Sequence, residues 1–499
     1  MKKILLIGFL SAVTIGFKPN KKNYEPYNKN FSKELTELKE FFHIPGLSVI
    51  IKHGDQTIFE DYLGFADVQK RIPMDSSTTI PMASLTKIFT GILIMQLVEN
   101  KKLSLDEPIK KYINDQNVGD SIKIKHVLSH TSQGNVGENF YYSSRFSWLT
   151  TVIERASGNS FENEINETII QPLKLNNTYL LIDSFQLAKK NRKIAMPYYY
   201  EGGIKDGIIE YGYSASAGIT STVRDLSAFN KAIDNNSLIS ENSKKKIFTP
   251  FKNSLPYGQG IFTETFQDQD LIWAYGQYDC YSSLFLKVPK KNLTLIMAAN
   301  NNLMSDPARL IYGDVCYSLF AISFLKNYVF DFANEPLFED SNSLSTLESR
   351  INPANAEFYR RKLLAQSIAE SFMSVYDISK MEKSVNILEK VFKLYPGYEN
   401  YSDLTLLHNL SFLKTVALFK KKENFSKFDT EIEKIGTKLL AIDSNNPYAN
   451  YYLADYFSSK NSNEAALKYF NRIVNAKNFS RNWYTSEAEN WLKAQQKKN

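Results

Sequence analysis

The stretch Pro81-Met82-Ala83-Ser84-Leu85-Thr86-Lys87-Ile88-Phe89-Thr90-Gly91 holds a serine and a lysine three residues apart, at the expected start of a helix. Residues i and i+3 share a helix face, so Lys87 can reach the hydroxyl of Ser84. A desolvated lysine can serve as the base for a serine nucleophile, and the free N–H groups of a first helical turn can stabilise developing negative charge. The same spacing also fits an amphipathic helix with a surface lysine. The pair therefore needs support from the rest of the chain.

The composition is that of a large globular protein. A chain of 499 residues with 43% hydrophobic and 13% aromatic residues predicts two or three domains with full-sized cores. The net charge of +7 is a mild excess, which argues against a nucleic-acid partner. Five histidines and two cysteines offer little material for a metal site, and we expect neither a metal nor a cofactor. Cys280 and Cys316 could pair in an oxidising compartment, but two isolated buried thiols fit better.

Residues 1–20 have the form of a secretory signal peptide. Lys2 and Lys3 precede an apolar run over residues 4–17, and polar, charged residues follow at once. The run is too short to span a bilayer comfortably, and no cysteine lies near it for a lipid anchor. We therefore expect an exported protein, periplasmic or secreted, with membrane contact only through this segment if it stays uncleaved.

Apolar runs predict an antiparallel sheet with covering helices in the first part of the chain. Residues 47–51 and 57–63 read as one hairpin, and residues 281–288 and 293–299 as another. A closing helix is expected over residues 304–325. The pair His126 and His130 could be metal ligands on a helix, but no glutamate lies between them and no third ligand follows, so a structural role at a helix end is expected.

The last third of the chain has a different character. Residues 331–354 are acidic and polar, which marks a linker, and helical periodicity with very little glycine then predicts an all-α domain of helical hairpins over residues 355–499. One set of residues matches the spacing of a tetratricopeptide helix pair: Leu453, Ala454, Phe457, Ala466 and Phe470. Such helical arrays bind protein partners or brace a catalytic domain, and both alternatives stay open.

Five segments occur in the order and spacing of a known family. They are Ile44-Pro45-Gly46-Leu47-Ser48-Val49, Met82-Ala83-Ser84-Leu85-Thr86-Lys87, Leu128-Ser129-His130-Thr131-Ser132, Gly218-Ile219-Thr220-Ser221-Thr222 and Tyr257-Gly258-Gln259-Gly260. On these motifs, residues 31–330 resemble the β-lactamase-related serine hydrolases, which include class C β-lactamases, low-molecular-weight penicillin-binding D,D-peptidases, esterases and D-aminopeptidases. The resemblance implies an α+β fold, an antiparallel sheet flanked by helices beside an all-helical lobe, with the active site in the groove between them.

The family's second motif is Tyr-x-Asn, whose tyrosine relays a proton to the leaving group. Its match is Tyr142-Ser143-Ser144, with Ser144 at the substrate-binding position where asparagine is usual. A shift of one residue would make Tyr141 the tyrosine. Tyr142 is preferred because it preserves the family's middle residue, and the alternative is that both tyrosines only pack the cleft wall.

The third motif centres on a lysine or histidine, usually before a glycine, and its match is Tyr275-Gly276-Gln277-Tyr278-Asp279-Cys280. Gln277 replaces the cation, so it can donate a hydrogen bond to substrate but contributes no charge. Tyr278 adds bulk where the family leaves room. Backbone N–H groups near residues 278–280, with that of Ser84, would form the oxyanion hole.

The resemblance implies an exported serine hydrolase that cleaves an amide or ester through an acyl-enzyme on Ser84, with Lys87 and Tyr142 as proton-transfer groups. Because carboxylate recognition usually depends on the missing cation, a peptide-like, D-amino-acid or ester substrate is favoured over a β-lactam. The alternative is a catalytically weakened, penicillin-binding-like receptor or scaffold for cell-wall fragments, with a partner-binding helical tail.

Overall fold

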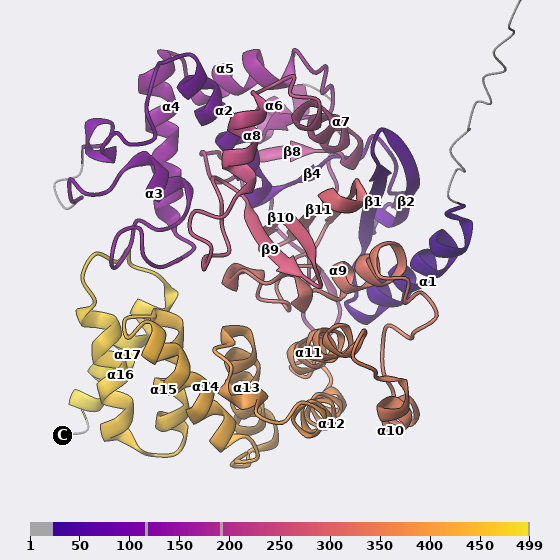
Figure 1. The fold of residues 1–499 in the computed structure, drawn as a ribbon, viewed down its shortest axis with the longest axis vertical. Coiled ribbons are helices and arrows are strands. Elements are labelled where there is room, and N and C mark those ends of the chain that lie inside the picture. Colours follow the sequence, from indigo (N-terminus) through magenta and orange to yellow (C-terminus); the bar gives the residue numbers. More distant parts are fainter. Residues whose placement is uncertain (1–22, 115–117, 190–192, 498–499) are drawn as a thin grey trace, which may run out of the picture.

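The computed structural model describes residues 23–114, 118–189 and 193–497 (Figure 1). The predicted signal peptide, residues 1–20, lies outside the described residues. Over the described ranges, no helix is both long and apolar enough to cross a membrane. Both cysteines, Cys280 and Cys316, are buried free thiols, as the sequence predicts.

A seven-stranded antiparallel sheet lies at the centre of the first part of the chain, with strand order β3-β2-β1-β12-β11-β10-β9. Its strands are β1 (Gly46–His53), β2 (Gln56–Asp67), β3 (Ile72–Pro73), β9 (Phe262–Phe266), β10 (Gln269–Tyr278), β11 (Tyr281–Val288) and β12 (Leu293–Ala299). The two predicted hairpins are confirmed as β1–β2 and β11–β12. β1 also pairs with β12, with Leu47 opposite Ala299, so the sheet joins the start of this region to its end.

Helices and short strands surround this sheet. The helices are α1 (Glu25–Phe41), α2 (Thr86–Glu99), α3 (Ile124–Leu128), α4 (Leu149–Ser157), α5 (Phe161–Ile165), α6 (Ser184–Lys189), α7 (Val223–Asp234), α8 (Glu241–Phe248) and α9 (Leu319–Phe324). The short strands β4 (Ile80–Pro81), β5 (Tyr179–Leu180) and β8 (Ile219–Ser221) form a second sheet, and β6 (Tyr198–Tyr200) pairs with β7 (Ile204–Asp206).

Successive residues of β1 face two different hydrophobic cores. Leu47, Val49 and Ile51 lie in a core shared with α1 and α9, whereas Ile50 lies in a core shared with α2, α4 and α7. Side chains of a strand alternate between faces, so an apolar strand of this kind needs cover on both sides. The predicted α+β architecture is confirmed.

The closing helix is shorter than the sequence prediction of residues 304–325. α9 begins only at Leu319, and short 3₁₀ turns over Leu310–Tyr312 and Val315–Tyr317 precede it. Arg309 and Gly313 have φ of +49° and +93°, and left-handed residues interrupt a right-handed helix. The irregular segment keeps Arg309 out of a helix.

The remaining chain forms an all-α region, which we call the helical region. It comprises α10 (Ser341–Arg350), α11 (Ala356–Met373), α12 (Ser379–Leu394), α13 (Leu404–Val416), α14 (Asp429–Ile442), α15 (Pro447–Ser459), α16 (Asn463–Asn475) and α17 (Trp483–Gln496). Neighbouring helices pack against each other along the chain, and in Figure 1 they lie as one layer beside the sheet-containing part. The tetratricopeptide assignment stays a prediction.

The expected linker, residues 331–354, is itself folded and packed. It contains α10, whose Leu347 is fully buried. Before α10, Glu339 binds Lys362 of α11 at 2.5 Å, and both of these side chains are fully buried. The connection therefore fixes the helical region close to the sheet.

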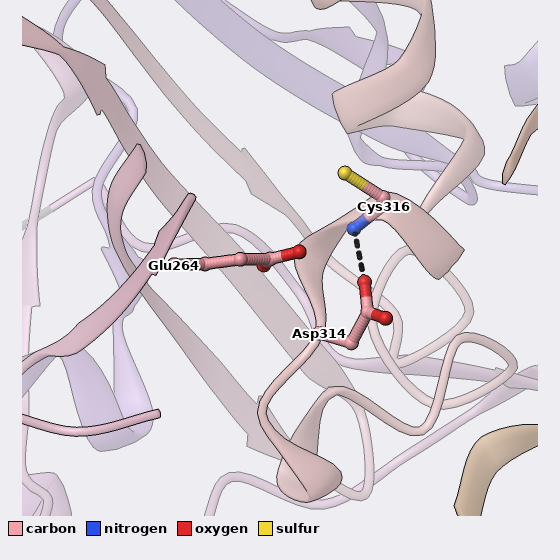
Figure 2. A group of neighbouring side chains, drawn as sticks. All are labelled: Glu264, Asp314 and Cys316. Carbon is pink, nitrogen blue, oxygen red and sulfur yellow. Dashed lines mark hydrogen bonds between the residues drawn. The ribbon is translucent and has the colours of Figure 1, made fainter. Parts of the chain in front are cut away.

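A buried charge cluster joins the helical region to the sheet. Figure 2 shows Glu264 of β9 beside Asp314 and Cys316, three side chains whose donor atoms are close enough to hold a metal ion. Arg361 of α11 contacts Glu264 at 3.4 Å and also pairs with Asp314. A guanidinium from the helical region thus supplies the positive charge at this cluster, which we call the Arg361 cluster.

Candidate active site

Ser84 lies in a 3₁₀ turn, Ala83–Leu85, that leads directly into α2. The turn packs against β10 and β11, where the Ser283 hydroxyl donates to the carbonyl of Met82 at 2.9 Å. Gly276 of β10 permits this approach, because a Cβ there would lie 2.0 Å from the Met82 oxygen. Ala83 has φ of +46°, a strained conformation for a residue with a side chain. The serine is therefore presented by a turn that the sheet holds in place.

Lys87 lies one turn into the helix, and its amine is directed at Ser84. Nζ is 2.9 Å from the Ser84 Oγ and donates to the carbonyl oxygen of Ser216, also at 2.9 Å. The side chain is 3% exposed, and it forms no ion pair with the described residues. Burial alone lowers the pKa of Lys87 to about 7. At neutral pH a large fraction of this amine is therefore neutral and able to accept a proton.

Tyr142 completes a three-residue cluster. Tyr142 lines the same cavity as Ser84, its hydroxyl is close enough to that of Ser84 to affect its own pKa, and the Lys87 amine lies 4.8 Å from the centroid of its ring. Burial raises the pKa of Tyr142, so the phenol stays protonated and can donate. The structure thus brings together Ser84, Lys87 and Tyr142, the three residues for which the sequence predicts the chemistry.

The neighbouring Tyr141 faces the opposite way. It is 2% exposed, and its hydroxyl donates to Asp443 in the helical region. Burial and the Asp443 carboxylate raise the pKa of Tyr141. Of the two tyrosines, only Tyr142 contacts Ser84 in this geometry, and Tyr141 forms a contact between the two parts of the chain.

His130 lies beneath Tyr142, a position that the sequence analysis missed. The two rings stack with centroids 4.3 Å apart, and the His130 Nδ1 accepts the backbone N–H of Ser143 at 3.0 Å. Burial and the nearby Lys87 lower the pKa of His130 well below its ordinary value. A neutral imidazole therefore supports the tyrosine ring from below. The segment that contains His130 was visible as a motif, but its packing partner was not.

The structure does not bring Ser144 into the cluster, although the sequence places it at the substrate. The Ser143 hydroxyl caps the 3₁₀ turn Ser144–Trp148 by accepting the N–H of Arg145 at 3.1 Å. Ser144 begins that turn, is exposed and does not line the cavity described below. A helical turn starting at this point leaves the Ser144 side chain on the outside.

A cavity of about 870 Å³ opens in front of Ser84 and Tyr142. The end of β10 forms one side with Tyr275, Gln277 and Tyr278. The opposite side comes from α13, α15 and α17 of the helical region, through His408, Ser411, Phe412, Tyr448, Tyr451, Tyr452, Asp455, Trp483 and Glu487. The helical region is therefore part of the site, which no local sequence motif could indicate.

Gln277 begins a chain of polar contacts across the cavity. Its Nε2 donates to Asp306 at 3.0 Å, and Asp306 accepts from Arg309 at 2.8 Å. The Nε of Arg309 then donates to His408 of α13 at 3.0 Å. The sequence predicts no cation at Gln277, and the structure supplies Arg309 nearby, but Asp306 already pairs with it. Arg309 and Asp306 were missed because a regular helix was expected there.

The turn after β10 only partly matches the expected oxyanion hole. The backbone N–H of Asp279 donates to Glu210 at 2.9 Å, so this donor is already engaged. Tyr278 lines the cavity, and burial raises its pKa to about 12. The Ser84 N–H at the start of the helix remains the candidate for oxyanion binding.

With this geometry established, comparison with known proteins identifies the fold family. The family model described as "Beta-lactamase" matches residues 32–313, more than half of the chain. The chain belongs to the β-lactamase family. All the residues of the Ser84 cluster lie inside the matched region, whereas the helical region lies beyond it.

Two curated proteins are similar in sequence to part of this chain. "Protein flp" of Staphylococcus aureus (strain MW2) is 25% identical over 308 residues, which cover 52% of this chain and 60% of that protein. "Putative penicillin-binding protein PbpX" of Bacillus subtilis (strain 168) is 25% identical over 264 residues, 47% of this chain and 65% of that protein. The match thus spans less than two thirds of the length of either relative.

A solved structure shows the same fold. The octameric penicillin-binding protein homologue from Pyrococcus abyssi superimposes with a TM-score of 0.54 at 21% identity, covering 68% of this chain and 81% of that chain. At this identity the likeness concerns the fold. Together with the family match, it shows that this chain has a β-lactamase-type fold.

Proposed function

We propose that this member of the β-lactamase family is a serine hydrolase that acts through an acyl-enzyme on Ser84. The observation that carries the proposal is the buried Lys87 amine, 2.9 Å from the Ser84 hydroxyl and with a pKa lowered to about 7. An amine with these properties can take the serine proton at neutral pH. No metal or cofactor is needed for this step.

The proton moves in a closed cycle. Neutral Lys87 takes the Ser84 proton as Oγ bonds to the carbonyl carbon, and the adduct then collapses with loss of the leaving amine or alcohol. Tyr142 donates its proton to that group and recovers one from the Lys87 ammonium. Water then attacks the ester on Ser84, and its proton returns to the serine as the acid product leaves.

The surroundings of the serine favour an amide or ester, peptide-like or containing a D-amino acid, over a β-lactam. Gln277 offers no charge, and its amide already donates to Asp306. Arg309 is paired with the same carboxylate, which weakens its attraction for a substrate carboxylate. These contacts oppose efficient binding of anionic lactams.

A covalent active-site probe tests the proposal. Intact-protein mass spectrometry after treatment with a fluorophosphonate or a labelled penicillin should show one adduct on the wild type and none on Ser84→Ala. Ser349→Ala, which removes an exposed hydroxyl on α10, is the matched control and should label like the wild type. Equal labelling of Ser84→Ala and the wild type would contradict the assignment.

A weakened receptor for cell-wall fragments is the second candidate, favoured by the lost cation at Gln277. It predicts stoichiometric labelling or tight non-covalent binding without turnover across esters, D-amino amides and lactams. Steady turnover that disappears in Lys87→Met would exclude it.

We propose further that the protein is exported through residues 1–20. Cell fractionation of the full chain and of a variant lacking these residues tests this point, and cytoplasmic retention of both would contradict it. A protein partner on the helical region also stays a prediction, to be tested by cross-linking with the full chain.

A further inference from the structure

We propose that the helical region supplies a subsite for a positively charged amine, so that the enzyme acts on acyl donors that carry an ammonium group instead of a carboxylate. The inference rests on the proposed hydrolase function and names its substrate class. It concerns the side of the cavity opposite Ser84, formed by α13, α15 and α17. We call the side chains Ser411, Tyr451, Asp455, Trp483 and Glu487 the amine subsite.

Negatively charged side chains predominate in the lining of the cavity. Five carboxylates line it: Glu210, Asp279, Asp306, Asp455 and Glu487. The lining holds one arginine, Arg309, and its guanidinium already binds Asp306 at 2.8 Å. A cavity of this kind attracts cations and repels anions.

Two of these carboxylates lie in the amine subsite without a cationic partner. Neither Asp455 nor Glu487 forms a salt bridge with the described residues. Asp455 accepts a bond of 3.3 Å from the Thr415 hydroxyl, which also contacts the carbonyl of Ser411 at 3.2 Å. Burial and the charge of Glu487 raise the pKa of Asp455, which is the condition that a bound cation would relieve.

Aromatic rings border the same carboxylates. Tyr451 and Trp483 meet edge to face, with ring centroids 4.8 Å apart and planes at 78°. Both rings line the cavity together with Tyr448 and Tyr452. Ring faces attract ammonium groups, and more strongly where water is partly excluded.

A second feature points independently to a ligand. Ser411 is 4% exposed, lines the cavity, and its hydroxyl has no hydrogen-bond partner among the described residues. The same is true of Nδ1 of His408, a side chain that is 8% exposed. Buried polar atoms are normally paired, so both call for a partner that enters the cavity. An ammonium N–H can donate to the Ser411 hydroxyl while its charge is balanced by Asp455.

Matched substrates test the subsite. D-Phenylalanine p-nitroanilide should exceed its N-acetyl derivative in kcat/KM by about tenfold in the wild type. Nα-acetyl-D-lysine p-nitroanilide and its Nα,Nε-diacetyl counterpart show whether a side-chain ammonium is accepted as well as an α-ammonium. Preference for either free amine supports the inference, and equal or better hydrolysis of both acetylated forms overturns it.

Substitutions test whether Asp455 and Glu487 cause the preference for substrates with a free amine. In Asp455→Asn/Glu487→Gln the preference should fall to about threefold or less. Glu464→Gln, an exposed carboxylate on α16 outside the cavity, should keep the full preference. An unchanged preference in the double variant would overturn the assignment.

A binding measurement does not depend on turnover. Calorimetry with Ser84→Ala should detect phenethylammonium but not 3-phenylpropionate, and the double substitution in that background should abolish the signal. If labelling of Ser84 fails but phenethylammonium binds, the hydrolase proposal falls and the subsite stands. If labelling succeeds and the ammonium does not bind, the subsite alone is wrong.

Discussion

In the proposed mechanism, Lys87 sets the pH range in which Ser84 can react. Its amine is buried without a carboxylate partner, and its pKa is lowered to about 7. Below this value the amine is protonated and cannot accept the serine proton. We expect kcat/KM for a neutral ester such as phenyl acetate to fall about tenfold per pH unit below pH 7 and to level off above it. A profile that is flat between pH 5 and 8 would remove Lys87 as the base.

The burial of Lys87 also makes the stability of the folded protein depend on pH. Between its folded pKa of about 7 and its ordinary value of 10.5, the unfolded chain binds more protons than the folded chain, so this residue's contribution to stability improves as pH rises through that window. Lys87→Met should therefore raise the melting temperature, and the gain should be larger at pH 6 than at pH 9. Its acylation rate should fall by about 10²–10⁴-fold. A lower melting temperature at both pH values would contradict this account.

Substitutions of the two adjacent tyrosines should have different effects, one on catalysis and the other on the contact between the two parts of the chain. Tyr142→Phe removes the hydroxyl beside Ser84 and should slow turnover by about 10²–10⁴-fold with little change in melting temperature. Tyr141→Phe removes a bond to Asp443 and should cost about 1.5–3 kcal/mol of stability while labelling of Ser84 persists. Paired measurements of ester hydrolysis and thermal unfolding check this, and the reverse pattern would restore Tyr141 as the proton donor.

At the level of single residues, the sequence predicts those site residues that lie within short motifs. Ser84 and Lys87 are one helical turn apart, and the Tyr142 motif lies close enough in sequence to be aligned with a family. Ser144 was misplaced because the turn that begins there depends on a cap by Ser143. Arg309 could not be anticipated, because its left-handed backbone places it in the cavity and such a conformation has no reliable sequence pattern.

Among the elements, α11 contributes a charged contact between the two parts of the chain, through Arg361. Arg361 provides the positive charge between Glu264 and Asp314, and burial raises the pKa of both acids. Arg361→Met should cost about 3 kcal/mol in denaturant unfolding, because two largely buried carboxylates lose their partner. The loss should be smaller at pH 5, where more of these acids are neutral.

An exposed ion pair of the same region provides the control. Lys393→Met breaks a contact with Glu348 in which the lysine side chain is 72% exposed, and it should cost about 1 kcal/mol or less. If both variants lose equally little, the Arg361 cluster does not hold α11 to the sheet.

The elements differ in how well their sequences specify them. The β11–β12 hairpin follows from two apolar runs around a short polar turn, and the structure has it over the predicted residues. The prediction of a helix over residues 304–325 was wrong because apolar periodicity gives no indication of the two residues with left-handed backbone, Arg309 and Gly313. The polarity of segment 331–354 predicts a linker, yet α10 folds there by burying Leu347 against later helices.

On the scale of the whole molecule, the helical region cannot be removed without exposing a large apolar surface. One hydrophobic core continues from β1 through α9 and α11 to Ala488 of α17. A chain ending at residue 339 should therefore be largely insoluble or aggregated and should not label at Ser84. A chain ending at residue 481 lacks only α17 and should remain soluble with a lower melting temperature, measured by calorimetry. A soluble chain ending at 339 with wild-type labelling would show that the first part folds alone.

The family resemblance implies an α+β part, helical periodicity predicts an all-α part after it, and the structure agrees with both. The resemblance and the periodicity did not reveal that the second part closes the cavity of the first. That arrangement depends on contacts between residues hundreds of positions apart, such as Tyr141 with Asp443 and Arg145 with Asn478. Local sequence patterns do not predict such contacts.

The distance along the chain between Ser84 and Glu487 has a consequence for biosynthesis. A ribosome completes the serine, the lysine and the tyrosine early in translation, but the last residues of the cavity, Trp483 and Glu487, are made some four hundred codons later. A nascent chain would carry Ser84, Lys87 and Tyr142 before the opposite side of the cavity exists. The cavity is therefore complete only after α17 has been synthesised.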